Sequence, residues 1–174
     1  MNDESNEQSP DRINLGSEKL KTFFIDHLNR IYSAKLHLIE RLPLLYREAY
    51  FSDLQNAIRE TVLNVEKQIA RMEMIYALLD KEVAPANVSG LTSLVDDAFE
   101  AIQRQKDDPE LRDLSIVFYL QNIESVEMAS FQILQMAAVK IKNQHVGQLL
   151  KENYQEAKAD RTLFLLVSTK YIAN

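Results

Sequence analysis

The sequence has 174 residues, of which 46% are hydrophobic, and this is enough to fill one core without a disulfide or a metal ion. Its 26 acidic and 20 basic residues give a formal charge of -6, so it offers no general basic surface for nucleic acid. The lack of cysteine excludes thiol catalysis and cysteinyl metal sites, and three glycines and four prolines are too few turn signals for a β-rich fold.

The N-terminal residues are polar and acidic and contain no apolar stretch of the kind that directs secretion. No apolar run approaches the roughly 18 residues that a membrane span requires. We therefore expect a cytoplasmic protein that binds neither membranes nor nucleic acid. Residues 1–16 bury too little apolar surface to offset the entropy of ordering, so we predict a disordered tail there and one domain over 17–174.

The first predicted helix starts after Ser17, a candidate N-cap, and carries apolar residues at steps of three and four. Pro43 is expected to kink this helix or end it early, because proline lacks an amide N–H and its ring crowds the preceding turn. A second helix with the same periodicity is capped by Ser52 or Asp53. After about Glu82 a stretch rich in Pro, Asn, Ser and Gly predicts a true connection.

A shorter amphipathic segment over residues 91–102 follows this connection. The third long helix begins near Pro109, which suits a first helical turn, and the last begins near Gln144. Tight joints within each pair of long helices, and a long crossover between the pairs, are typical of ferritin-like bundles. We therefore predict an all-α fold, a ferritin-like antiparallel four-helix bundle with a short extra helix in the crossover between helices 2 and 3.

Each long helix also places polar residues where its apolar period predicts the core. Carboxylates and imidazoles that project inward from facing helices are how such bundles build dinuclear metal sites. The candidate metal ligands here lack the usual histidines, because the chain has three histidines and none stands in the Glu-x-x-His pair of a di-iron bundle. The residues predicted to form a polar cluster in the core are Lys35, Asn64, Gln68, Glu124, Glu127, Asn153, Glu156 and Asp160.

Lys35 decides what this cluster can do. Its ammonium could reach the surface along its aliphatic stem, or it could be buried and paired with an anion, because an unpaired buried charge is costly. Glu127, Glu124 and Glu156 are the candidate partners. Both alternatives for Lys35 stay open at this point.

Four segments of the chain resemble the YciE/YciF family of ferritin-like proteins: FFIDHLNRIYSAKLHLIERLPLL, QIARMEMIYALL, QNIESVEMASFQIL and LLKENYQEAKADRTL. The similarity extends over residues 19–167, with the helices in the same order. The resemblance implies a ferritin-like fold, often dimeric, with a candidate di-metal centre and an association with bacterial stress responses.

The chain departs from the family pattern at the candidate metal centre. Where the family usually reads Tyr-Ser-Ala-Glu, the fourth residue here is Lys35, and Asn64 stands where the second helix usually carries a glutamate. Glu124, Glu127 and Glu156 are retained and would be the ligands if a metal bound. Because a cation replaces the first-helix carboxylate, we expect no cofactor and a metal-free core in which Lys35 stands in electrostatically for the ion.

Our first hypothesis is a stress-related, non-enzymatic protein with a degenerate di-metal site that acts by association, most simply as a homodimer. Residues 114–120 and 163–167 are apolar nearly all round, which is more than one core face can use.

Two alternatives stay open. One is a metal-handling or di-iron oxidase-type protein in which Glu124, Glu127, Glu156 and Asp160 hold iron or manganese, although the missing histidines and Lys35 argue against redox cycling. The other is a partner-binding helical bundle with no ferritin-like ancestry.

Overall fold

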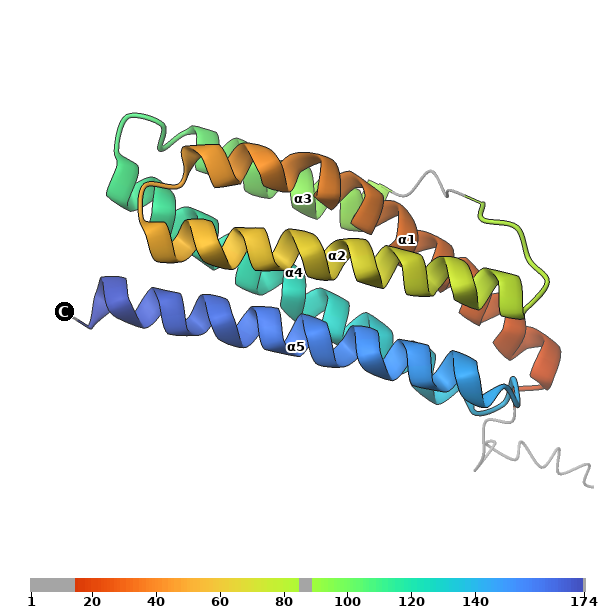
Figure 1. The fold of residues 1–174 in the computed structure, drawn as a ribbon. Coiled ribbons are helices and arrows are strands. Elements are labelled where there is room, and N and C mark those ends of the chain that lie inside the picture. The colour runs from red at the N-terminus through yellow and green to blue at the C-terminus, as the bar shows by residue number, and fades with distance from the viewer. Residues whose placement is uncertain (1–14, 85–88, 174) are drawn as a thin grey trace, which may run out of the picture.

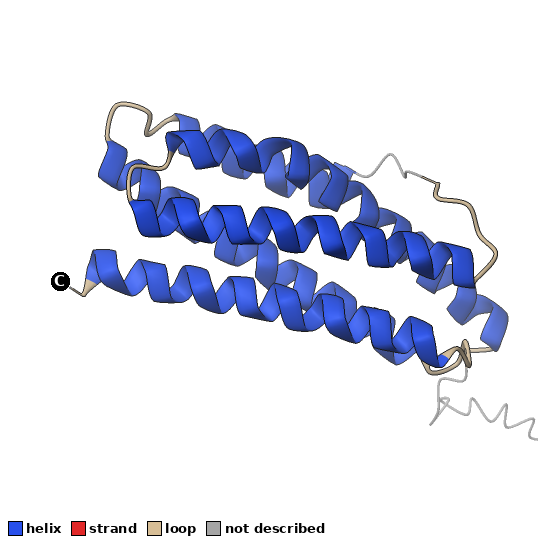
Figure 2. Ribbon diagram, viewed as in Figure 1, coloured by secondary structure: helices blue, strands red, loops and turns tan. Residues whose placement is uncertain are grey.

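In a computed structural model of the chain, the described residues are 15–84 and 89–173, and they form five α-helices and no strand (Figure 2). The helices are α1 (Ser17–Glu48), α2 (Ser52–Leu78), α3 (Ser89–Gln103), α4 (Pro109–Ala138) and α5 (Gln144–Ile172). The all-α prediction is thus confirmed for these residues. Most of the predicted tail, residues 1–14, lies outside the described part of the chain. No described helix has the length and apolar character needed to cross a bilayer.

The four long helices lie side by side, and each contacts two of the others in the order α1, α2, α5, α4 (Figure 1). Short connections join α1 to α2 and α4 to α5, so neighbouring long helices run in opposite directions. Helix α3 packs against α1 and α4. It carries the chain back along the molecule, so that α4 starts at the same end as α2 (Figure 1).

Helices α1 and α2 start at Ser17 and Ser52, as the sequence indicated, but the predicted N-cap residues were wrong and Pro43 does not end α1 early. Gly16, and not Ser17, is the N-cap of α1, and α2 is likewise capped one residue earlier than predicted, by Phe51. Helix α1 also continues through Pro43 to Glu48. Pro43 is exposed, so water can satisfy the carbonyl that loses its amide partner, while leucines on the opposite face keep the helix packed.

The starts of α4 and α5 are as predicted. Helix α4 begins at Pro109, after an N-cap aspartate, Asp108, whose side chain accepts a hydrogen bond from the backbone amide of Leu111. Helix α5 follows Asn143, which caps it in the same way. Both caps satisfy amides that the first helical turn leaves without an acceptor.

The core consists of two apolar clusters separated by a polar layer. One cluster joins the second half of α1 and the first half of α2 to the first half of α4 and the second half of α5. The other cluster joins the opposite halves of the same four helices. Buried polar residues lie between the two clusters at mid-length of each long helix, namely Lys35, Gln68, Glu124, Glu127, Asn153 and Asp160.

A buried carboxylate holds the joint between α1 and α2. Asp113 on α4 is fully buried and accepts hydrogen bonds of 2.9 to 3.1 Å from the backbone amides of Tyr50 and Phe51. It also accepts one from the Tyr171 hydroxyl at 3.2 Å. An anion near the first turn of a helix is favourable as well. Asp113 therefore ties the start of α2 to both α4 and α5.

We expect Asp113→Ala to lower the free energy of unfolding by about 2 kcal/mol, because two backbone amides lose their acceptor. Urea unfolding followed by circular dichroism measures this. The control is Asp97→Ala on the exposed face of α3, which should leave stability almost unchanged. Equal effects of the two changes would show that Asp113 does not hold the joint.

Candidate functional site

Lys35 lies at the centre of the polar layer and is fully buried. Its ammonium donates a hydrogen bond to the Glu127 carboxylate, which lies across the core on α4 and is 8% exposed. The Lys35 Nζ atom is also 6.0 Å from the ring centroid of Phe131. Of the two alternatives for Lys35, the structure thus shows the buried, paired one.

Two more carboxyl groups act on this pair, Glu124 from α4 and Asp160 from α5. Burial by itself lowers the pKa of Lys35, because it disfavours the charged ammonium. The carboxylates of Glu127 and Glu124, with a smaller effect of Asp160, outweigh burial and raise that pKa above its usual value. Lys35 is therefore a cation in the folded protein at neutral pH.

Glu124 is fully buried and is the carboxyl group least able to carry a charge. Burial, followed by the negative charge of Glu127, raises the pKa of Glu124 well above its usual value. As a carboxylate it has no donor among the described residues, since neither of its oxygens is hydrogen-bonded. As the neutral acid it can donate a hydrogen bond to Glu127, and this favours the protonated form further.

Asp160 has a weaker but related shift. Burial raises its pKa from 3.8 to about 6, although the hydrogen bond from Asn64 and the charge of Lys35 act in the opposite direction. The Asn64 amide donates to Asp160 Oδ1 at 2.8 Å, while Oδ2 is buried and makes no hydrogen bond with the described residues. Asn64 itself is half-buried and lies at the edge of the layer.

Uncharged polar atoms complete the layer. Gln68 is fully buried, and neither its amide nitrogen nor its amide oxygen is hydrogen-bonded to the described residues. Asn153 is also fully buried and donates to the Gln68 backbone carbonyl at 3.3 Å. Thr61 lies two turns before Gln68 on the same face of α2, and its buried hydroxyl likewise has no described partner.

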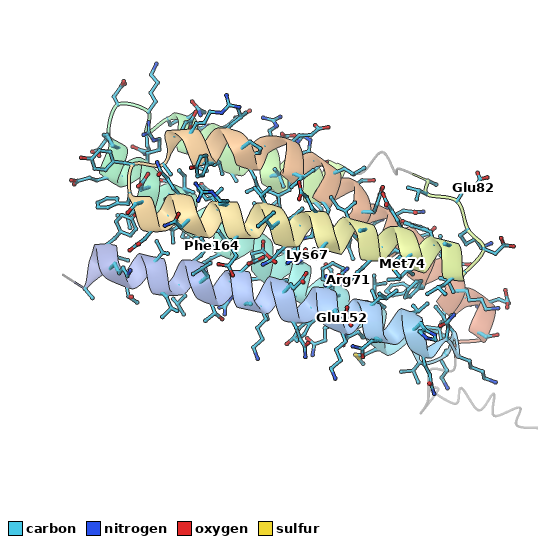
Figure 3. All side chains as sticks on the ribbon, in the orientation of Figure 1. Lys67, Arg71, Met74, Glu82, Glu152 and Phe164 are labelled. Atoms are coloured by element: carbon cyan, nitrogen blue, oxygen red, sulfur yellow. The ribbon has the colours of Figure 1, made fainter. Side chains whose placement is uncertain are left out.

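Glu156 does not lie with Lys35, which corrects its predicted place in the core cluster. It is half-buried, and Arg71 of α2 binds both of its oxygens, at 2.6 and 2.9 Å. Arg71 also bridges Glu152 at 3.0 Å, and Figure 3 shows these two residues where α2 and α5 lie side by side. Glu156 lies at the edge of the layer because the bidentate ion pair with Arg71 stabilises its carboxylate there. An unpaired carboxylate buried in the core would instead be costly.

Arg71 and Thr61 were not among the site residues predicted from the sequence. Arg71 follows Gln68 by three residues, a spacing that places the two on neighbouring positions of one helical face. This spacing, together with Glu152 and Glu156 four residues apart on α5, was the available signal for a cation at the edge of the layer.

The three histidines lie away from the polar layer. His27 stacks with Phe23 at 4.2 Å between ring centroids, His37 lies 2.7 Å from Asp96, and His145 is exposed near the start of α5. Across residues 15–84 and 89–173, no three His, Cys, Asp or Glu side chains converge in a way that could hold a metal ion.

The fold and this layer define a class of protein, an all-α protein whose four long helices enclose a polar centre. The chain belongs to the family described as a domain of unknown function, DUF892, whose model matches residues 19–170. It is the family of YciF, so the resemblance inferred from the four sequence segments is confirmed.

Named relatives support this assignment. Protein YciF of Escherichia coli strain K12 is 25% identical over 146 residues, which cover 83% of this chain and 87% of YciF. The crystal structure of the E. coli stress protein YciF matches with a TM-score of 0.83 and 22% identity, over 89% of this chain and 98% of that one. YcfI of Rhodopseudomonas palustris matches with a TM-score of 0.79 and 23% identity, over 90% of this chain and 96% of that one. The solved structures thus share the fold of this chain.

Proposed function

We propose that this chain is a ferritin-like four-helix bundle protein with a degenerate di-metal site, and that it acts by association and not as an enzyme. The Lys35–Glu127 ion pair carries the proposal, because it puts an ammonium where the family pattern has a carboxylate. A fixed positive charge in the centre of the layer repels a metal cation and uses one of the remaining carboxylates.

The other donors do not fit a dinuclear centre either. Such a centre takes about four carboxylates and two imidazoles, and its ligands must be deprotonated. Of the three carboxyl groups that act on Lys35, Glu127 is paired with it, Glu124 favours its neutral form, and Asp160 accepts a hydrogen bond from Asn64. Glu156 is held by Arg71. We therefore propose that the core is metal-free and that Lys35 compensates the charge that metal ions would otherwise balance.

The role by association is supported by apolar side chains that the packed helices leave exposed, among them Phe118 on α4 and Leu166 on α5. We extend two properties to this chain as part of the same proposal: a homodimeric state, and a role in stress, since E. coli YciF is described as a stress protein. A cytoplasmic location completes the proposal.

A metal-handling protein is the second candidate, and one observation favours it. Both oxygens of Glu124 and Oδ2 of Asp160 are buried without hydrogen-bond partners among the described residues. Oxygen atoms of this kind suit a hard cation such as manganese(II) or iron(II). Lys35 and the shortage of further donors make this candidate the weaker one.

Elemental analysis separates the two candidates. Protein expressed with added iron, manganese and zinc and then dialysed should contain only substoichiometric metal. The double variant Lys35→Glu with Asn64→Glu restores the carboxylates of the family pattern and should gain metal binding, because it exchanges a cation for two anionic ligands. Its matched control is Lys67→Glu, an exposed change on the same helix as Asn64, which should gain none. Stoichiometric metal in the unmodified protein would favour the metal-handling candidate instead.

A further inference from the structure

A groove is open to the surface where α1, α3 and α4 meet. Its volume is about 510 Å³, which lies within the range of about 300–1,000 Å³ that small-molecule sites have. Its lining is largely apolar, with Phe23 and Ile31 from α1, Leu91 from α3 and Val126 and Ile133 from α4. Phe23 is 37% exposed and Ile133 is 50% exposed, so apolar surface in this groove is left in contact with water. Such a hollow can bury an apolar ligand.

The groove is elongated along the two helices that form its long walls. The wall on α1 extends from Phe23 to Ile31 and the wall on α4 from Val126 to Leu134, each about 12 Å at a rise of about 1.5 Å per residue. Because α1 and α4 are antiparallel neighbours, Ile31 and Val126 lie at one end of the groove and Phe23 and Leu134 at the other. An extended alkyl chain of medium length fits such a groove better than a compact polar metabolite does.

The groove has a cation but no anion. Among the described residues that line it, Arg30 is the one with a fixed charge, and none is a carboxylate. Arg30 is exposed and forms no ion pair or hydrogen bond with residues 15–84 or 89–173. His27 lies one turn earlier, with its ring stacked on Phe23 and its ring nitrogens without hydrogen-bond partners in the same part of the chain. In a chain with 26 acidic and 20 basic residues, an unpaired guanidinium beside an apolar groove suits a carboxylate that a ligand supplies.

A second cation, Lys35, lies beyond the inner wall of the groove. A smaller hollow continues from Ile31 and Val126 to Glu127, but its volume is about 10 Å³, which is no more room than one water molecule needs. Lys35 is also already paired with Glu127. A ligand carboxylate can therefore bind Arg30 and not Lys35, and the chain attached to it lies along the outer groove.

We propose that this groove binds a medium-chain fatty acid, with the carboxylate on Arg30 and the alkyl chain between α1 and α4. Burial of the chain against the apolar lining supplies most of the affinity, and the guanidinium distinguishes the acid from a neutral lipid. The proposal goes beyond the role by association. It depends neither on that role nor on a metal-free core, since no residue that lines the groove belongs to the polar layer.

Isothermal titration calorimetry of the full chain with decanoate and with 1-decanol tests the proposal. One decanoate should bind per chain, and 1-decanol should bind about 10-fold more weakly, because it lacks the charge. Arg30→Gln should weaken decanoate binding about 10-fold and leave 1-decanol binding unchanged, since only the acid uses the guanidinium. The matched control is Arg47→Gln, an exposed change near the other end of α1, which should bind both ligands as the unmodified protein does.

A second variant tests the position of the alkyl chain. Ala129 is exposed in the α4 wall of the groove, so Ala129→Trp fills the space without disturbing the core. It should weaken the binding of both decanoate and 1-decanol at least about 10-fold. Ala70→Trp adds the same side chain at an exposed position of α2 and should have no effect on either ligand. Circular dichroism should show that all four variants are folded.

Each contrary outcome overturns a stated part of the proposal. No binding of decanoate to the unmodified protein would overturn it as a whole and leave the groove to a protein side chain. Equal losses of decanoate and 1-decanol in Arg30→Gln would show that Arg30 does not hold the carboxylate. Undiminished binding to Ala129→Trp would show that the alkyl chain lies outside the groove. None of these outcomes bears on the association or on the metal content, which are measured separately.

Discussion

Lys35→Met should lower the free energy of unfolding by about 3–5 kcal/mol at pH 8, because it leaves the buried Glu127 carboxylate without its cation. Glu124 and Asp160 would then face Glu127 with no positive charge between them. At pH 5 the loss should be smaller, since Asp160, whose pKa is about 6, is then protonated and no longer repels Glu127. The cost of removing Lys35 should therefore fall with falling pH.

Urea unfolding of the variant and the unmodified protein at both pH values measures this difference. The control Lys67→Met removes an exposed lysine from α2 and should have almost no effect at either pH. The double variant Lys35→Met with Glu127→Leu should recover most of the lost stability, because replacing both members of a buried pair by apolar residues is often neutral. A small, pH-independent loss for Lys35→Met alone would contradict a buried ion pair.

Asp160→Asn should make the protein more stable than the unmodified chain at pH 7.5 and about equally stable at pH 4. The folded-state pKa of Asp160, about 6, lies above its ordinary value of 3.8, so the folded protein holds this proton more tightly than the unfolded chain. The stability that protonated Asp160 contributes is complete below about pH 4 and is lost as pH rises through 6. Such a shift corresponds to a gain on the order of 3 kcal/mol for the asparagine variant at pH 7.5.

Urea unfolding between pH 4 and pH 8 tests this prediction. The asparagine side chain keeps an oxygen that can accept from Asn64, so the variant removes the titration with little change in shape. Asp97→Asn on the exposed face of α3 is the matched control and should follow the unmodified protein at every pH. Parallel pH profiles for Asp160→Asn and the unmodified protein would show that Asp160 does not titrate in the layer.

Both predictions depend on a balance of charges that the sequence suggests only in part. Lys35 interrupts an apolar stripe, and a buried ammonium requires an anion, so Glu127 was among the partners proposed from the sequence alone. The two alternatives for Lys35 differ only in where the end of a flexible side chain lies. Periodicity places the Cα atom on a helical face and says nothing about that end, so the contact across the core was needed to decide between them.

Helical periodicity was also insufficient to predict the contacts of the Glu156 side chain. Its period on α5 is that of a core residue, and its family motif is that of a ligand, yet it binds Arg71 at the edge of the layer. The partner comes from a different helix, 85 positions away in sequence, and only the packing of α2 against α5 brings the two together. A pairwise contact over such a distance leaves no local pattern in the sequence.

The sequence by itself determined the all-α class, the long, long, short, long, long order of helices and the family, because helical periodicity, helix starts and motifs are local properties. It also indicated that polar residues stand at mid-length in the core rows of the long helices. Only the tertiary structure decided that Lys35 is buried against Glu127, that Glu156 pairs with Arg71, and that residues 114–138 of α4 bury their two charged side chains and leave an uncharged face outside. These outcomes depend on which side chains contact one another across the core, and helix packing determines those contacts. A group that becomes buried must then be either paired with an opposite charge or neutral.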